Sequence, residues 1–125
     1  MAINNLDLKK IEKIINAELS SKITSSKISF EELMLYTSAN EITEVIQFLK
    51  SDNRFKFKQL IDIAAIDYPN KEKRFELVYL LLSIENNQRI KISIKFEIDE
   101  KIPSLTKIFP SANWMEREVF DMYGV

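Results

Sequence analysis

The segment "RIKISIKFEI", Arg89 to Ile98, alternates apolar and polar residues throughout and constrains the fold more than any other part of the chain. Side chains of a β-strand point to opposite faces in turn, so such a segment has one apolar and one polar face. This pattern is typical of an antiparallel strand that lies against a core on one side and faces water on the other. The apolar positions are Ile90, Ile92, Ile94, Phe96 and Ile98.

Two preceding segments also predict strands. "RFELVYLLLSI", Arg74 to Ile84, is apolar on both faces, which favours a central strand. From Arg54 onward, "RFKFKQLIDIAAI" alternates Phe with Lys before becoming more uniformly apolar. "IENNQR" predicts a hairpin turn between the last two strands, because Asn86-Asn87 can adopt the positive φ angles of a type I′ turn.

The N-terminal half predicts a helix from about Leu6 to Ser21 and short strands at Lys27–Phe30 and Leu33–Tyr36. A second helix, from about Glu41 to Ser51, has apolar residues at helical spacing, and Ser38 or Asn40 can cap its start. The expected order is therefore α-β-β-α-β-β-β-α in a single domain spanning residues 1–125. Such an order favours an α+β two-layer sandwich, a mainly antiparallel or mixed sheet with the helices packed on one face.

The composition excludes most catalytic chemistry. The chain has no Cys and no His, so thiol nucleophiles, iron–sulfur ligation, common zinc sites and imidazole acid–base catalysis are excluded. Its single glycine, Gly124, cannot form a glycine-rich phosphate loop. A net charge of −1 provides no field that would attract nucleic acid or an anionic membrane. A carboxylate-only metal site or a lysine Schiff base stays open, but no spacing in the sequence suggests either. We therefore expect a chain that is not itself a catalyst.

The last residues, "NWMEREVFDMYGV", predict a terminal helix over 113–124. Asn113 and Glu116 have the spacing of a capping box, and Gly124 suits the position that ends the helix. Asp121 near the C-terminal end faces the negative end of the helix dipole, which is unfavourable for a carboxylate. One interpretation is an ordinary surface pair of Arg117 with Asp121, worth about 0.3–0.5 kcal/mol. The other is a partner outside this chain.

A free-standing enzyme using carboxylates of this helix is a further alternative. It would need two acids converging on one substrate. Glu116 and Glu118, however, diverge by about 200° on a helix of 3.6 residues per turn. This spacing argues against an acid pair.

The end of the chain, "FPSANWMEREVFDMYGV", resembles the signature of the C-type subunit of the proton-pumping NADH-quinone oxidoreductase, respiratory complex I. That signature reads Glu-Arg-Glu-x-x-Asp-Met-aromatic-Gly-aliphatic after an aromatic-Pro-x-Ala-x-Trp lead-in. A looser similarity covers "LIDIAAIDYPNKEKRFELVYLLLS", Leu60 to Ser83, where an Asp-Tyr-Pro turn precedes an aromatic-rich strand. The matching signature residues are Phe109, Pro110, Ala112, Trp114, Glu116, Arg117, Glu118, Asp121, Met122, Tyr123, Gly124 and Val125.

The resemblance implies a hydrophilic, cofactor-free subunit in the peripheral arm of the complex, with FMN and iron–sulfur clusters in partner subunits. It implies docking beside the D-type, quinone-site subunit, on the cytoplasmic side of the cell inner membrane or on the matrix side in mitochondria. Such a protein would scaffold electron transfer from NADH to quinone without catalysing it. Related membrane-bound hydrogenases and formate hydrogenlyases carry similar domains and remain an alternative.

The resemblance also places the subunit interface on the signature helix, at Trp114, Glu116, Arg117, Glu118, Asp121 and Gly124. We hypothesise that its four charged residues form one cluster that locks the helix to the domain or to a partner. Family members continue past the Gly-aliphatic pair into a basic, proline-containing tail, whereas this chain stops at Val125. The sequence is therefore compatible with a functional short form or a truncated fragment, and it leaves the quinone type and the strand order open.

Overall fold

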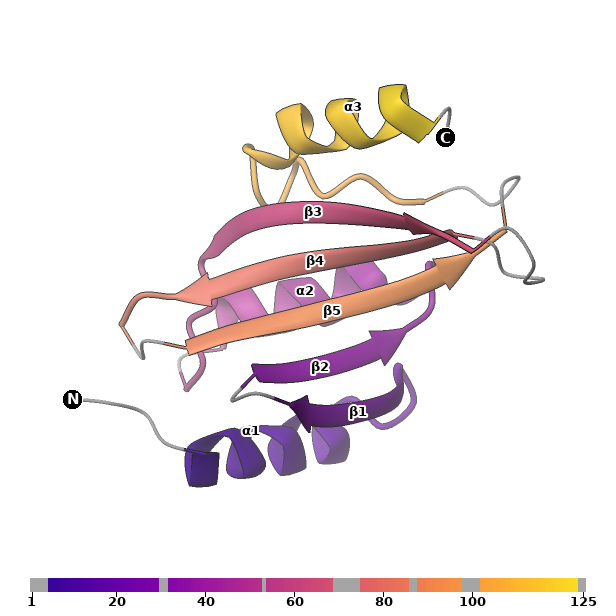
Figure 1. The fold of residues 1–125 in the computed structure, drawn as a ribbon. Helices are drawn as coiled ribbons and strands as arrows, with labels where there is room; N and C mark the ends of the chain where they lie inside the picture. Colours follow the sequence, from indigo (N-terminus) through magenta and orange to yellow (C-terminus); the bar gives the residue numbers. More distant parts are fainter. Residues whose placement is uncertain are drawn as a thin grey trace.

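The computed structural model describes residues 5–29, 32–52, 54–68, 75–85, 88–97 and 102–123, except for the side chains of residues 5–8, 29 and 120–123. Figure 1 shows a twisted sheet with helices behind it and beside both of its edges. The order of elements agrees with the predicted α-β-β-α-β-β-β-α. The elements are α1 (Asn5–Glu18), β1 (Ile23–Ser29), β2 (Glu32–Thr37), α2 (Ile42–Ser51), β3 (Gln59–Asp67), β4 (Phe75–Ser83), β5 (Gln88–Phe96) and α3 (Ala112–Tyr123).

The five strands form one mixed sheet in the order β1-β2-β5-β4-β3. β1 with β2, β3 with β4, and β4 with β5 pair antiparallel, whereas β2 and β5 pair parallel. β5 is therefore the central strand and is antiparallel on one side only, which corrects the prediction of an antiparallel strand, whereas the mixed sheet is one of the two predicted kinds. Its polar face is also not uniformly wet, because Ser93 is buried. β4 is an internal strand, as predicted.

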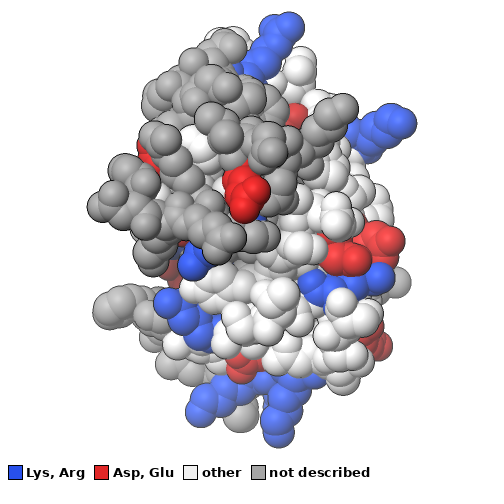
Figure 2. Space-filling model, turned by 90° about the vertical axis from the view of Figure 1, so that its right-hand side faces the viewer, with Lys and Arg blue, Asp and Glu red and all other residues white. Residues whose placement is uncertain are grey.

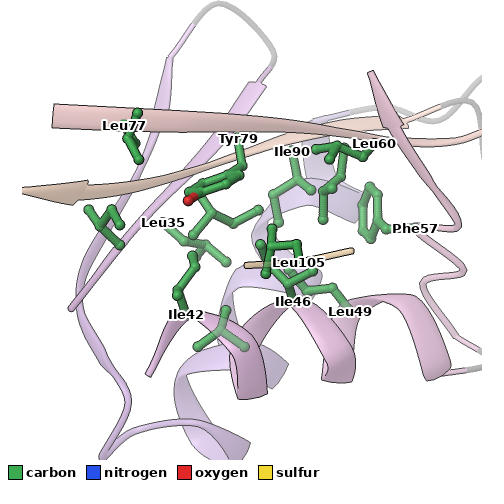
Figure 3. Packing of buried hydrophobic residues seen from close by; sticks show 14 of the residues in the cluster. Leu35, Ile42, Ile46, Leu49, Phe57, Leu60, Leu77, Tyr79, Ile90 and Leu105 are labelled. Atoms are coloured by element: carbon green, nitrogen blue, oxygen red, sulfur yellow. The ribbon is translucent and has the colours of Figure 1, made fainter. Parts of the chain in front are cut away.

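One face of the sheet carries the hydrophobic core. Alternate residues of β4 and β5 lie opposite one another on this face, as in the pairs Leu81 with Ile90 and Tyr79 with Ile92. Figure 3 shows Ile42, Ile46 and Leu49 of α2 pointing toward this face. Each such fully buried aliphatic side chain stabilises the fold by about 1.5–3 kcal/mol relative to exposure.

The other two helices pack on the same side of the sheet. Ser26 of β1 pairs with the core residue Leu35, and its hydroxyl donates a 2.7 Å hydrogen bond to Glu12 of α1. Leu105, from the linker before α3, lies beside Ile46 in the core (Figure 3). The sandwich with its helices on one face is therefore as predicted, with α1 and α3 near the two edges of the sheet, beside β1 and β3 (Figure 1).

β3 begins later than the alternation of Phe and Lys predicts. Residues 54–58 form a turn and a short irregular stretch instead, with Lys56 at a φ of 54°. Their backbone bonds run to the end of α2, since the N–H of Phe57 donates to the carbonyl of Leu49 at 3.1 Å. Phe55 and Phe57 are both buried in this arrangement, which accounts for the alternating pattern without a strand.

Two predicted local details have different outcomes. The residue at the N-cap of α2 is Glu41 and makes no side-chain capping bond, so the prediction that Ser38 or Asn40 caps this helix is wrong. β4 and β5 form the predicted hairpin, paired to its end at Ser83 and Gln88. The proposed turn residues, Asn86 and Asn87, lie outside the described part of the chain.

Candidate docking surface on the terminal helix

A folded linker fixes the start of α3. Leu105, Ile108 and Phe109 are buried, and the N–H of Phe109 donates to the carbonyl of Leu105 at 2.7 Å. Lys50 of α2 donates to the carbonyl of Ile108 and places its ammonium 5.1 Å from the centre of the Phe109 ring. These contacts attach the linker to α2, so α3 begins from a packed segment.

Glu116 attaches α3 itself to this linker. Its side chain is only 7% exposed, and its carboxylate accepts hydrogen bonds from the Leu105 N–H at 2.9 Å and from the Ser104 hydroxyl at 2.8 Å. The predicted capping box with Asn113 is therefore wrong. The helix begins at Ala112, and its first N–H groups donate to linker carbonyls instead. No local pattern reveals this role, because the partners of Glu116 precede the helix.

The carboxylate of Glu116 also affects the core beneath it. Burial raises the pKa of Tyr79 well above its usual range, and the negative charge of Glu116 raises this pKa further. Tyr79 lies on the core face of β4, so the charge of α3 acts across the interface between helix and sheet. Both observations agree that the Glu116 side of α3 faces the domain.

The opposite side of α3 faces outward. Trp114 is 67% exposed, and Arg117 and Glu118 are exposed as well. Residues three and four positions apart are neighbours on a helix surface, so these side chains share one face. An indole with this exposure is unusual in a surface helix and is enriched at protein interfaces. We call Trp114, Arg117 and Glu118 the Trp114 surface.

The described side chains of the predicted charged cluster therefore lie on different sides of α3. Glu116 points inward, while Arg117 and Glu118 make no ion pair with each other or with any other described side chain. Asp121 belongs to the backbone of α3, but its side chain lies outside the described part of the structure. Gly124 lies outside the described residues altogether. The structure thus separates an anchoring acid from an outward surface, which the sequence pattern did not.

The strand beside α3 carries exposed apolar residues. α3 packs close to β3, on which Ile61 and Ile66 are 41% and 39% exposed, and the register places Ile66 opposite Glu76 on the sheet face away from the core. An open hollow of about 350 Å³ lies where the linker meets the start of β3, lined by residues including Lys58, Phe109 and Pro110. Phe109 and Pro110 belong to the signature described above, whereas no sequence pattern marks Lys58, Ile61 or Ile66 as surface residues, and Ile61 and Ile66 belong to an apolar run that predicts a strand.

The described charges do not suggest a catalytic or metal site. Figure 2 shows basic and acidic side chains interspersed on the side of the molecule that it presents. Within the described ranges, no group of three or more His, Cys, Asp or Glu residues is placed to hold a metal ion. Glu116 and Glu118 point to opposite sides of α3, so they do not form an acid pair.

No helix among the described residues has the length and apolar character needed to cross a membrane.

The comparisons with known proteins all point to the same family. Residues 35–125 match the family described as respiratory-chain NADH dehydrogenase, 30 Kd subunit. The chain is 42% identical over 118 residues, 94% of its length, to the C-type subunit of NADH-quinone oxidoreductase from Rhodospirillum rubrum. It is 39% identical over 121 residues, 97% of its length, to the corresponding protein of Chelativorans sp.. Over 103 residues, 82% of its length, it is 44% identical to that of Ruegeria pomeroyi.

The matched part includes α3 and the whole of the sheet except β1 and the start of β2. The chain spans only about half the length of these relatives, 52% to 60%. The family match nevertheless covers well over half of this chain. The chain therefore belongs to the family of the 30 kDa subunit of the respiratory-chain NADH dehydrogenase.

Proposed function

We propose that this chain is a non-catalytic peripheral-arm subunit of the proton-pumping NADH-quinone oxidoreductase. In this role it scaffolds the subunits through which electrons pass from NADH, by way of FMN and iron–sulfur clusters, to quinone. These groups are held by partner subunits and none by this chain. Its neighbours are the D-type, quinone-site subunit and other hydrophilic subunits, on the cytoplasmic side of the inner membrane or on the matrix side in mitochondria. Family membership supports this assignment.

The observation that carries the proposal is the exposure of Trp114 on a helix that is fixed from beneath. Exposing an indole to water is unfavourable, because its apolar surface contributes about 25 cal/mol per Å² when buried. Glu116 and the linker hold the helix in place, so a partner meets a preformed surface. A rigid aromatic side chain flanked by an exposed Arg is a typical anchor of protein interfaces.

Co-purification tests the proposal. We expect the tagged chain, isolated from its native membranes, to bring with it the subunits of NADH-quinone oxidoreductase. Trp114→Ala should reduce their recovery by about tenfold or more, because truncating a central aromatic anchor costs about 2 kcal/mol or more of binding energy. The thermal midpoint of the isolated chain should change little, since Trp114 is mostly exposed.

A matched control is available in Ile84, which is 63% exposed in the turn after β4. Ile84→Ala removes a similarly exposed apolar side chain away from α3 and should leave recovery unchanged. Recovery of no respiratory subunit with the unmodified chain contradicts the proposed function. Recovery of nickel-iron hydrogenase subunits instead assigns the chain to a membrane-bound hydrogenase or formate hydrogenlyase.

A further inference from the structure

The face of the sheet opposite the core has no described helix or loop over it. Figure 1 views this face directly, with α2 behind the sheet. The strand register places on it the residues that alternate with the core positions, as in the pairs Ala64 with Val78 and Leu80 with Lys91. We call this surface the open face.

An apolar stripe runs along β3 and β4 on the open face. The register brings together side chains from these two strands, which are Ala64, Ile66, Val78, Leu80 and Leu82, while β5 beside them carries Arg89, Lys91, Ser93 and Lys95. Ile66 is 39% exposed and Ala64 is exposed, while Leu80 and Leu82 are half-buried. The solvated face of a sheet is ordinarily polar, so an apolar stripe of this extent indicates a surface that another protein covers.

A buried acid closes one end of the stripe. Glu76, only 6% exposed, accepts a hydrogen bond from the Ser93 hydroxyl and another, at 2.9 Å, from the Tyr68 hydroxyl. Both carboxylate oxygens are thus bonded beneath the surface. A partner that covers this end does not have to desolvate an unbonded carboxylate, which would be costly.

The exposed charges around the stripe are mainly basic; the exception on β3 is Asp62, which is exposed and lies opposite Leu80. Lys27, Arg89 and Lys95 are exposed on the open face, and none of them pairs with an acid among the described residues. Lys91 has a partner already, since its ammonium lies 3.4 Å from the Glu32 carboxylate. A surface that complements this face therefore has an apolar centre and carboxylates at its rim.

We propose that the open face is a second docking surface, which binds an apolar segment of another subunit flanked by Asp or Glu. This inference rests on the proposed function and extends it, because the open face and the Trp114 surface belong to different elements of the domain. The partner of the open face need not be the one that meets α3. A protein with two such surfaces holds its neighbours in a fixed relative position, as a scaffold requires.

A second copy of this chain does not complement the open face. Two copies placed face to face would bring the cations Lys27, Arg89 and Lys95 of each copy into one interface, where Asp62 is the exposed acid that the described part of this face offers. Like charges across an interface are unfavourable and suppress the wrong partner. Charge therefore favours a different protein with acidic residues.

Site-specific photo-crosslinking tests this proposal on the assembly purified from native membranes. A photoreactive benzoylphenylalanine replaces Leu80 at the centre of the stripe. The matched control carries the same group at Gln47, which is exposed on α2 on the far side of the sheet. We expect a defined adduct from position 80, mapped by mass spectrometry to an apolar segment with adjacent Asp or Glu in another subunit. Position 47 should give no adduct with that segment.

Charge reversal at the rim gives a second measurement. Lys95→Glu should lower the yield of the position-80 adduct by about fivefold, the size of effect expected for one exposed ion pair. Lys13→Glu, an equivalent reversal on the exposed side of α1, should leave the yield unchanged. Equal effects of the two reversals would contradict a specific acidic partner.

The outcomes separate this proposal from the proposed function. If respiratory subunits co-purify but position 80 gives no adduct with any of them, the open face is not a docking surface and the proposed function stands. An adduct between two copies of this chain also overturns the proposal. If another multisubunit assembly co-purifies and one of its subunits is cross-linked at such a segment, the docking surface stands while the proposed function fails.

Discussion

The carboxylate of Glu116 lies 2.9 Å from the backbone nitrogen of Leu105 and accepts its N–H, although Leu105 precedes it by 11 residues. Leu105 is itself fully buried in the core (Figure 3). The bond therefore connects the helix that carries Trp114 to the centre of the domain. Because a buried N–H without an acceptor is costly, this contact fixes the orientation of α3.

Loss of the Glu116 carboxylate should destabilise the domain. Glu116→Ala leaves the buried Leu105 N–H without its acceptor, and such a loss costs about 1–3 kcal/mol. Urea denaturation monitored by circular dichroism measures this change. Glu118→Ala removes an exposed acid of the same helix and should change the free energy of unfolding by less than about 0.5 kcal/mol. Equal stability of the two variants would contradict an anchoring role for Glu116.

Removal of the Ser93 hydroxyl should destabilise the sheet through the buried acid Glu76. Ser93→Ala leaves one oxygen of that carboxylate without its hydroxyl donor, at a cost of about 1–3 kcal/mol. The double variant Ser93→Ala with Glu76→Gln should recover part of this loss, because a neutral amide is less costly to bury than a charge. Ser25→Ala, at an exposed position of β1, is the control for unfolding in urea.

Acid should weaken the contact between Asp52 and Arg54. The side chain of Arg54 donates hydrogen bonds to both oxygens of Asp52, at 2.9 and 2.6 Å, and thereby lowers the pKa of that carboxyl below its usual value. A lowered pKa in the folded state gives stability that is present above the ordinary pKa of Asp, about 3.9, and lost as the pH falls through the folded value.

The Asp52→Asn variant checks this expectation. The difference in stability between wild type and variant should be small, at most about 1 kcal/mol for such a surface pair, and should shrink as the pH falls from neutral to below the ordinary Asp pKa. Denaturation midpoints in urea at a series of pH values measure it. A difference that grows on acidification would contradict the role of Arg54.

Much of the fold follows from the sequence because its patterns are local. The alternation in Arg89–Phe96 identifies β5, and the short connection to β4 leaves an antiparallel hairpin as the natural pairing. The apolar spacing of Ile42, Val45, Ile46 and Leu49 identifies the buried side of α2. These signals depend only on neighbouring residues, so no knowledge of distant contacts is required.

Other features depend on contacts that local patterns do not contain. The parallel pairing of β2 with β5 joins segments separated by α2, β3 and β4, and no residue in either strand specifies it. The turn at Lys56 resembles a strand in sequence because Phe55 and Phe57 alternate with lysines, and in the structure both phenylalanines are buried. The same burial pattern arises from two backbone conformations, and tertiary contacts decide between them.

In the candidate site, too, the sequence predicts some features and misses those that depend on distant contacts. The sequence identified the terminal helix and the residue Trp114, whereas it placed Glu116 in a capping box and in a cluster with Arg117. Helical spacing alone could not show which of two adjacent charges faces the domain, because Ser104 and Leu105 belong to an irregular linker. The assignment of Trp114, Arg117 and Glu118 to an interface stays a prediction for the binding experiments above.

Tyr79 should ionise only at strongly alkaline pH. Burial raises its pKa, the charge of Glu116 adds to this effect, and the phenol therefore retains its proton more strongly in the folded than in the unfolded chain. A raised pKa in the folded state gives stability that is fully present below the ordinary tyrosine pKa of about 10 and lost as the pH rises above it. The domain should consequently lose stability in alkali as the unfolded chain releases this proton.

Spectrophotometric titration of tyrosinate tests the prediction, since the chain has four tyrosines and Tyr79→Phe removes one of them. The variant should lack the latest component of the titration, and its stability should fall less steeply above about pH 10 than that of wild type. Glu116→Gln removes the charge but keeps an acceptor for Leu105, so it should shift this component to lower pH. If Tyr79 instead titrates with the other tyrosines while the fold is intact, the phenol is not buried against Glu116 as the structure places it.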